Sequence, residues 1–142
     1  MICYHIPVAV KEPFLTTIST QDRVVEFFTD ARQVQSQAIE RLEAGDLRDA
    51  AEKAWCATKR ATDALILART GEEPPTTAAT SDHLDNLCRR EPETRTLQGR
   101  YYSRIHHLHG MCFYSGYCND QTERRIRETV SYIDDAERLA TA

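Results

Sequence analysis

Apolar side chains recur at intervals of three, four or seven residues in the first half of the chain. One such series comprises Val24, Phe28, Ala31, Ala38 and Leu42. This spacing places the series on one face of an amphipathic helix. Ser19 and Thr20 are good N-cap residues, and Gly45 is a good helix terminator. The pattern therefore predicts a first helix that begins near Ser19 or Thr20 and runs to Ala44.

A second helix is expected over Leu47 to about Thr70, with Asp46 as its N-cap and Gly71 at its end. Its repeating stripe consists mainly of alanine: Ala50, Ala51, Ala54, Ala57, Ala61, Ala64 and Ala68. Small side chains let neighbouring backbones approach closely, so we expect this helix to be the central one of a bundle. The short Gly45–Asp46 link predicts a tight antiparallel hairpin.

The second half of the chain predicts a short third helix from His83 to about Arg90, capped by Ser81. Pro92 disfavours helical geometry at the residue before it, which ends this helix. A fourth helical segment is expected from roughly Glu93 to Phe113, and Gly110 inside it marks a kink or a close contact.

The last helix opens with Asp120 as its cap and Glu123 at the capping-box position. It presents a further apolar series to the core, formed by Ile126, Val130, Ile133 and Leu139. The fold class is therefore all-α. In contrast, residues 1–18 alternate in hydrophobicity and contain Pro7 and Pro13, which forbid a long helix. These residues are expected to form an extended N-terminal arm, leaving residues 19–142 as the bundle.

Composition fits this single domain. The chain has 142 residues, of which 41% are hydrophobic and 28% charged, as in an ordinary globular protein. The start of the chain resembles neither a signal peptide nor a membrane span, so we expect a cytoplasmic protein with no membrane partner. The five cysteines include no C-x-x-C motif, and only Cys112 and Cys118 lie close in sequence. This scattered, odd-numbered set is typical of free thiols in a reducing compartment.

The segment from Arg100 to Tyr117 is the densest in groups able to bind anions, stack or transfer protons. It contains three of the five histidines and four of the six tyrosines. Histidine titrates near neutral pH and arginine binds phosphate, so Arg104 and His109 are candidates for cleaving RNA through its 2′-hydroxyl. Five positions place these two side chains about 140° apart on an ideal helix, so they meet only at a distortion or across a dimer interface.

Two stretches point to a known family: GDLRDAAEKAWCATKRATDALILA at residues 45–68, and LHGMCFYSGY at residues 108–117 followed by the final amphipathic helix. Together they resemble the HEPN superfamily, and most closely its archaeal PaREP-type branch, over about Gln21 to Ala142. The resemblance implies an antiparallel up-and-down bundle of four or five helices, commonly a homodimer. In some members it also implies a nucleotidyltransferase-type antitoxin partner.

Many HEPN proteins are metal-independent endoribonucleases whose signature is an arginine, then four to six intervening residues, then a histidine. The resemblance thus assigns catalysis to Arg104 and His109, and a second register joins Arg100 to His106 or His107. Active members usually have a polar residue after the arginine, whereas Ile105 follows Arg104 here. The tyrosine that toxin members often carry two positions after the histidine is replaced by Met111.

Charge favours a focused anion site over general nucleic-acid binding. Residues 89–127 contain eight arginines and four acidic residues, although the whole chain has a formal net charge of −4. We therefore expect a module that binds RNA or a nucleotide through Arg100, His106, His107 and Tyr114, together with the Arg104–His109 pair.

Four alternatives remain open at this stage. The first is a toxin-like endoribonuclease, and the second is a non-catalytic helical assembly protein. The third, which is the least favoured, is a zinc protein whose ligands include His106, His109 and Cys112. In the fourth alternative, the arginines of residues 89–127 simply pair with acidic side chains on a solvent-exposed face. No cofactor and no metal are expected.

Overall fold

The computed structural model describes Cys3 and residues 18–142, and every regular element within them is helical. This confirms the predicted all-α bundle. The predicted arm over residues 1–18 lies outside the described residues except for Cys3 and Ile18, so its conformation stays a prediction. In chain order the elements are α1 (Thr20–Glu43), α2 (Leu47–Thr70), α3 (Thr77–Arg90), the 3₁₀ turn η1 (Pro92–Thr94), α4 (Arg95–Arg104), the π-helix η2 (Ile105–Tyr114), α5 (Thr122–Arg127) and α6 (Thr129–Thr141).

The first two helices form the predicted antiparallel hairpin. The side chains of Ser19 and Asp46 each accept a hydrogen bond from the backbone N–H three residues further on, at 3.1 Å in both cases. Gly45 takes a positive φ of 85° in the connecting turn, which favours glycine there. The bounds of α2 match the prediction, and α1 ends one residue before the predicted Ala44.

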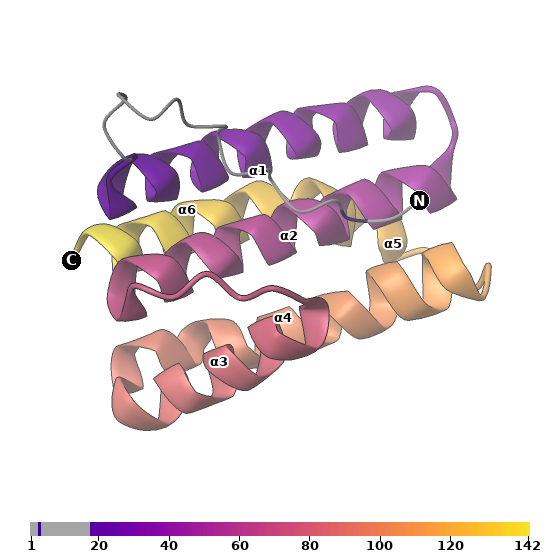
Figure 1. Cartoon of the computed structure of the whole chain (residues 1–142). Helices are drawn as coiled ribbons and strands as arrows, with labels where there is room; N and C mark the ends of the chain where they lie inside the picture. The colour runs from indigo at the N-terminus through magenta and orange to yellow at the C-terminus, as the bar shows by residue number, and fades with distance from the viewer. Residues whose placement is uncertain (1–2, 4–17) are drawn as a thin grey trace.

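Helix α2 is the centre of the bundle, as its alanines predicted. Every residue from 50 to 67 is buried except Lys53. The helix packs against α1, α3, α4, α5, α6 and η2. In Figure 1, α1 lies on one side of α2 and α6, while α3 and α4 lie on the other. Other helices pack around α2 on several sides. Polar side chains of α2 can therefore take part in sites on different faces of the bundle.

The third helix begins earlier than predicted. Thr76, rather than Ser81, is its N-cap, and the Thr76 hydroxyl accepts from the Ala79 N–H at 3.1 Å. Ser81 lies inside the helix, and its hydroxyl is within 2.7 Å of the Tyr101 hydroxyl of α4. Ser81 therefore makes a contact between α3 and α4 instead of capping a helix. The local sequence does not reveal this contact.

The predicted fourth helix changes its winding part-way. It is α-helical to Arg104 and then π-helical from Ile105 to Tyr114. Gly110 lies within the π-helix, but a Cβ atom placed there would meet only the Ile105 carbonyl at 3.6 Å. The position thus has ordinary room, and the distortion does not depend on a close approach at Gly110.

The predicted last helix is two helices. It breaks at Glu128, between α5 and α6, and the side chain of Asp120 does not cap it. Instead, Asn119 exchanges hydrogen bonds with the start of α5, where its N–H donates to the Thr122 hydroxyl at 2.9 Å. Ile126, Ile133 and Leu139 are buried as predicted. Val130 is not: it is 47% exposed, so its assignment to the core was wrong.

The free-thiol prediction was also wrong. Cys3 is joined to Cys56, and Cys112 to Cys118, which leaves buried Cys88 as the free cysteine among the described residues. The first pair spans 53 residues, a separation that spacing in the sequence could not reveal. Within the part of the chain that the structure describes, no helix has the length and apolar character needed to cross a bilayer.

Overfilling the centre of α2 tests this packing. Ala61 is fully buried, so Ala61→Leu inserts three carbon atoms between closely packed helices. We expect the free energy of unfolding to fall by about 1–3 kcal/mol, measured by urea denaturation. Ser36→Leu, at an exposed position of α1, is the matched control and should change it little. Equal effects of the two substitutions would contradict the central position of α2.

Candidate functional site

Arg104, the last residue of α4, is a buried cation held by uncharged oxygen atoms. Only 7% of the residue is exposed. Its Nε donates to the Thr58 hydroxyl at 3.0 Å, and its Nη2 donates to the Arg125 carbonyl and to the Thr129 hydroxyl. Within residues 18–142, no carboxylate forms an ion pair with it.

Both threonines are oriented to accept these hydrogen bonds. The Thr58 hydroxyl donates to the Ala54 carbonyl at 2.9 Å, and the Thr129 hydroxyl donates to the Arg125 carbonyl at 3.1 Å. Each hydroxyl proton is therefore already donated to a carbonyl one helical turn earlier. The lone pairs of the two hydroxyl oxygens remain free to accept from Arg104. The site fixes the guanidinium but does not neutralise it.

The surroundings of Arg104 lower its pKa to about 10. Burial is the main cause; the nearby Arg100 and Arg125 act in the same direction, and Tyr132 and Glu128 oppose it. The side chain still carries its charge at neutral pH, so the protein bears the cost of burying a cation beside other cations. An anion placed next to it would reduce that cost.

A cleft of about 630 Å³ opens beside this guanidinium. We call it the arginine cleft, and its lining consists of Gly99, Arg100, Ser103, Arg104, Arg124, Arg125, Glu128, Ser131 and Asp135. The predicted residues Arg100 and Arg104 thus share one surface. The sequence had marked Arg124 and Arg125 only as part of an arginine-rich segment. The break between α5 and α6, which the sequence did not reveal, helps bring them to α4.

Two of the four arginines have carboxylate partners. Arg100 donates to Asp135 at 2.7 Å and lies 5.2 Å from the centroid of the Tyr132 ring. Arg124 pairs with Glu128 at 2.8 Å. Arg125 has only a long contact of 3.4 Å to the Asn119 side-chain oxygen. The cleft therefore keeps a net positive charge.

The predicted histidines divide between two environments. His107 is close enough to Arg125 for that cation to lower its pKa, an effect second to burial. His106 is exposed and meets the His107 ring edge to face, with centroids 4.8 Å apart. Neither imidazole lines the arginine cleft, although His107 is within electrostatic reach of Arg125.

His109 lies elsewhere, against α2. Its Nδ1 is 2.7 Å from Oε1 of Glu52, a carboxylate whose side chain is only 1% exposed. The imidazole, 40% exposed, also contacts the Trp55 and Phe113 rings. Burial raises the pKa of Glu52, and the interaction with His109 opposes this shift. Sequence reasoning missed Glu52, although an acid within an alanine-rich buried stretch was the available signal.

The structure does not give Arg104 and His109 a common partner. A distortion is present, because η2 is π-helical over the interval that separates them. However, the two side chains contact α2 at Thr58 and Glu52, which are six residues, or about 9 Å, apart along the axis. His109 does not line the arginine cleft either.

Tyr114 also lies outside the cleft lining. It is 78% exposed at the end of η2, and its carbonyl accepts from Arg48 at 3.3 Å. Cys112, considered as a zinc ligand, is bound to Cys118 in a disulfide and so offers no thiolate. Among the residues that the structure describes, no group of three or more metal-ligating side chains comes together.

A comparison with known families decides the wider relationship. A model of the archaeal PaREP1/PaREP8 family matches residues 26–135. The chain belongs to this family. The predicted PaREP-type relationship is thereby confirmed, whereas membership of the larger HEPN superfamily stays a prediction. No curated protein and no solved structure matches the chain.

The burial of Glu52 in this PaREP1/PaREP8 protein is expected to make its stability depend on pH. The pKa of Glu52 is raised above 4.5 on folding. Its contribution is therefore complete below the unfolded pKa and is lost as pH rises through the folded pKa. Relative to wild type, Glu52→Gln should become progressively more stable as the pH rises above 4.5, the ordinary pKa of the carboxyl, measured by urea unfolding.

Glu40→Gln is the control for this measurement, because Glu40 is exposed on α1. Its stability relative to wild type should stay nearly constant over the same range. A constant difference for Glu52→Gln as well would contradict the idea that burial governs this carboxylate.

Proposed function

We propose that the protein binds a phosphate group of RNA or of a nucleotide in the arginine cleft. The observation that carries this proposal is the buried Arg104, which is fixed by uncharged oxygens and has no carboxylate partner among the described residues. A phosphate would supply the missing negative charge, and its oxygens would accept hydrogen bonds from the remaining N–H groups of the guanidinium. Arg125 adds a second cation, because among the described residues its guanidinium makes only the long hydrogen bond to Asn119.

The lining also suggests which part of the ligand is recognised. It contains arginine, serine, acidic and glycine residues but no aromatic or aliphatic side chain. Such a surface suits phosphate and ribose oxygens and offers no platform for stacking a base. The proposed ligand is therefore held by its backbone, with little preference for the base.

The wider biological setting is part of the same proposal. Membership of the HEPN superfamily would account for an arginine- and histidine-rich segment that approaches RNA. A cytoplasmic location would give access to RNA and nucleotides. The two disulfides are compatible with this location in hyperthermophilic archaea, whose intracellular proteins are often rich in disulfides.

Titration of a fluorescent single-stranded RNA at several salt concentrations tests the binding proposal. Arg125→Ala and Arg104→Met should each weaken binding, and each should reduce the salt slope by about one counterion. Arg104→Met keeps much of the side-chain length. The hydroxyl protons of Thr58 and Thr129 stay bonded to carbonyls in this variant, so we expect the fold to survive.

Arg127→Ala provides the matched control. Arg127 lies on the same helix as Arg125, but it pairs with Glu43 and Glu123 instead of lining the cleft. Its removal should leave the affinity and the salt slope nearly unchanged. Equal losses in Arg125→Ala and Arg127→Ala would reduce the proposal to general charge attraction, and no binding at low salt would overturn it.

A second candidate function, metal-independent RNA cleavage, is favoured by the position of His107. This imidazole is within electrostatic reach of Arg125, whereas His109 is held against Glu52 outside the cleft. A phosphate in the cleft would therefore place its ribose nearer to His107. Of the registers that fit the family signature, Arg100 with His107 agrees best with this arrangement.

Cleavage of an end-labelled RNA in EDTA distinguishes the registers. If His107 carries the proton, His107→Ala should abolish formation of cyclic-phosphate ends, while His109→Ala should retain most of it. The reverse result would favour the Arg104–His109 pair. Absence of cleavage by the wild-type protein, together with RNA binding that depends on Arg125, would leave a binding module without nuclease activity.

A further inference from the structure

Helix α5 carries two of the four arginines that line the arginine cleft, yet it is the shortest α-helix among the described residues. It has six residues. A helix of this length is not stable on its own in water, because it is too short to repay the cost of nucleation. Contacts with other parts of the chain must therefore fix α5, and they also decide where Arg124 and Arg125 lie.

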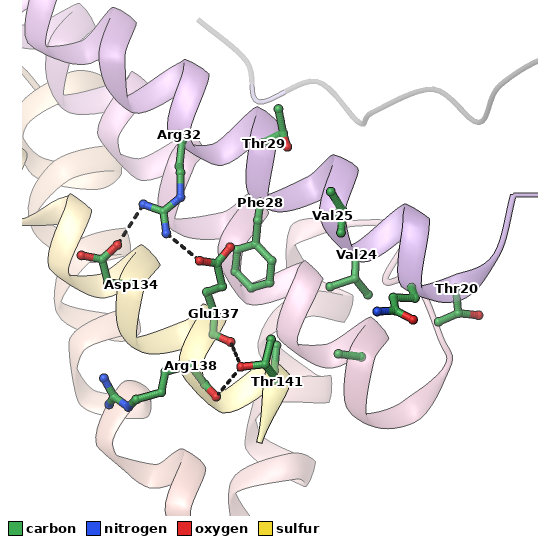
Figure 2. Close-up of a pocket in the computed structure, with 13 residues that line it drawn as sticks. Thr20, Val24, Val25, Phe28, Thr29, Arg32, Asp134, Glu137, Arg138 and Thr141 are labelled. Atoms are coloured by element: carbon green, nitrogen blue, oxygen red, sulfur yellow. Dashed lines mark hydrogen bonds and ion pairs between the residues drawn. The ribbon is translucent and has the colours of Figure 1, made fainter.

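Helix α6, which follows directly, has anchors of its own. It has 13 residues. At the open cleft between α1 and α6 in Figure 2, Arg32 donates to Asp134 at 2.9 Å and to Glu137 at 3.0 Å. On another side of α6, the Tyr132 hydroxyl lies 2.7 Å from the Thr62 hydroxyl of α2. The position of α6 therefore does not depend on the loop that precedes α5.

The C-terminal end of α5 is also held by other helices. The Ile126 side chain is fully buried, and its carbonyl accepts from the Gln35 side chain of α1 at 2.8 Å. The Arg125 carbonyl accepts from Arg104 of α4. These contacts fix the end of α5 but not its first turn.

Asn119 organises the N-terminal end of α5. Its backbone N–H donates to the Thr122 hydroxyl at 2.9 Å, and its side-chain oxygen accepts from the Gln121 N–H at 2.9 Å. The same oxygen accepts the long hydrogen bond from Arg125 at 3.4 Å. The position of Asn119 therefore determines both the first turn of α5 and one neighbour of a cleft arginine.

A covalent bond fixes the residue next to Asn119. Cys118 is joined to Cys112 of η2, only six residues earlier. A short loop constrains the unfolded chain less than a long one, so this bond adds less to global stability than Cys3–Cys56, which spans 53 residues. Its main effect is local, because it ties the start of α5 to the end of η2.

The end of η2 is itself firmly held. Arg48 of α2 donates from Nε to the Phe113 carbonyl at 3.0 Å and from Nη2 to the Tyr114 carbonyl at 3.3 Å. Cys112 is fully buried in the core. The disulfide therefore connects the loop before α5 to a rigid part of the bundle.

The surroundings of this disulfide also accommodate its reduced form. The Leu47 carbonyl lies 3.9 Å from the Cys112 sulfur, and the Cys112 carbonyl lies 3.5 Å from the Cys118 sulfur. Each thiol formed by reduction therefore has a backbone acceptor within reach. Cys118 is partly exposed, whereas Cys112 is fully buried, so a reductant reaches the Cys118 sulfur first.

We propose that the Cys112–Cys118 disulfide is a redox-sensitive clamp on α5 that controls the arginine cleft. A thiolate of a dithiol reductant attacks the Cys118 sulfur and displaces the Cys112 thiolate, which takes up a proton. The second thiol of the reductant then attacks the reductant's own sulfur in the mixed disulfide and releases Cys118 as a thiol. Two electrons and two protons pass to the protein, and the reductant leaves as a disulfide. A disulfide oxidant reverses the exchange.

Reduction releases the start of α5 but not the rest of the fold. The buried Ile126 and its bond to Gln35 keep the end of α5 in place, so only residues 118–124 gain freedom. Arg125 then loses a fixed neighbour, and Arg124 lies in a frayed turn. The consequence for ligands rests on the proposed function: the reduced protein binds phosphate groups more weakly than the oxidised protein.

Hydrogen exchange of the full chain tests the clamp without any ligand. Dithiothreitol should speed the exchange of residues 118–124, while residues 50–67 of α2 stay protected. Cys118→Ser should show the faster exchange without reductant and should not respond further. Cys3→Ser lacks the other disulfide and keeps this one, so it is the matched control and should respond as wild type does. Alkylation followed by mass spectrometry shows which bonds have opened.

Titration with a fluorescent single-stranded RNA tests the link to the cleft. Reduced wild type and Cys118→Ser should both bind with a dissociation constant severalfold above that of the oxidised wild type. In Arg125→Ala the difference between oxidised and reduced protein should largely disappear, because the clamp acts through this side chain. Arg127→Ala, on the same helix but outside the cleft, should keep the difference.

Three results would overturn the proposal. The first is a native protein in which dithiothreitol leaves the Cys112–Cys118 bond closed, or opens it without changing the exchange of residues 118–124. The second is a Cys3→Ser protein that no longer responds, which would assign the effect to the other disulfide. The third is equal RNA affinity of the oxidised and reduced proteins. RNA that binds neither form would overturn the proposed function, whereas the exchange of residues 118–124 still decides whether the clamp exists.

Discussion

The close packing around α2 is the constraint on which the rest of the structure depends. Alanines along this helix bring the other helices near its backbone, and almost every residue from 50 to 67 is buried. A helix enclosed in this way must satisfy any polar side chain within the interior. Thr58 does so by joining the Ala54 carbonyl to Arg104, and Glu52 by its contact with His109. The central helix thereby organises two polar sites from the inside.

These two sites differ in how they treat charge. The Glu52 carboxylate faces a single imidazole that reaches solvent, so its charge has a local partner. Arg104 donates hydrogen bonds to hydroxyl and carbonyl oxygens, while Arg100, Arg125 and the Glu128 carboxylate lie near enough to affect its pKa. The first arrangement pairs the carboxylate within the chain, whereas in the proposed function a phosphate of the ligand would complete the second. This contrast, more than the number of arginines, is the reason for proposing a binding site at the arginine cleft.

Much of the fold followed from the sequence because its signals were local. The hairpin was predictable because Ser19, Asp46 and Gly45 act on the backbone within a few residues. The break at Glu128 and the π-helical winding after Arg104 were not, since both depend on packing between elements distant in sequence. Pairing of Cys3 with Cys56 also depends on tertiary structure. For the candidate site, residue type indicated arginine and histidine as the groups of interest, and their role stays a prediction. Which of them share a surface required knowing where the winding changes.

The break between α5 and α6 has a consequence for how the arginine cleft responds to its environment. Near the end of α5, the Arg125 carbonyl accepts a hydrogen bond from Arg104. A backbone group at a helix terminus thus takes the place of the carboxylate that often accepts from a buried arginine. A backbone dipole cannot be protonated. With the pKa of Arg104 near 10, neither the guanidinium nor its acceptors change charge around neutral pH. The charge of the Arg104 site is thus constant around neutral pH. Any pH sensitivity of the proposed ligand binding in that range must come from the ligand or from a neighbouring imidazole such as His107.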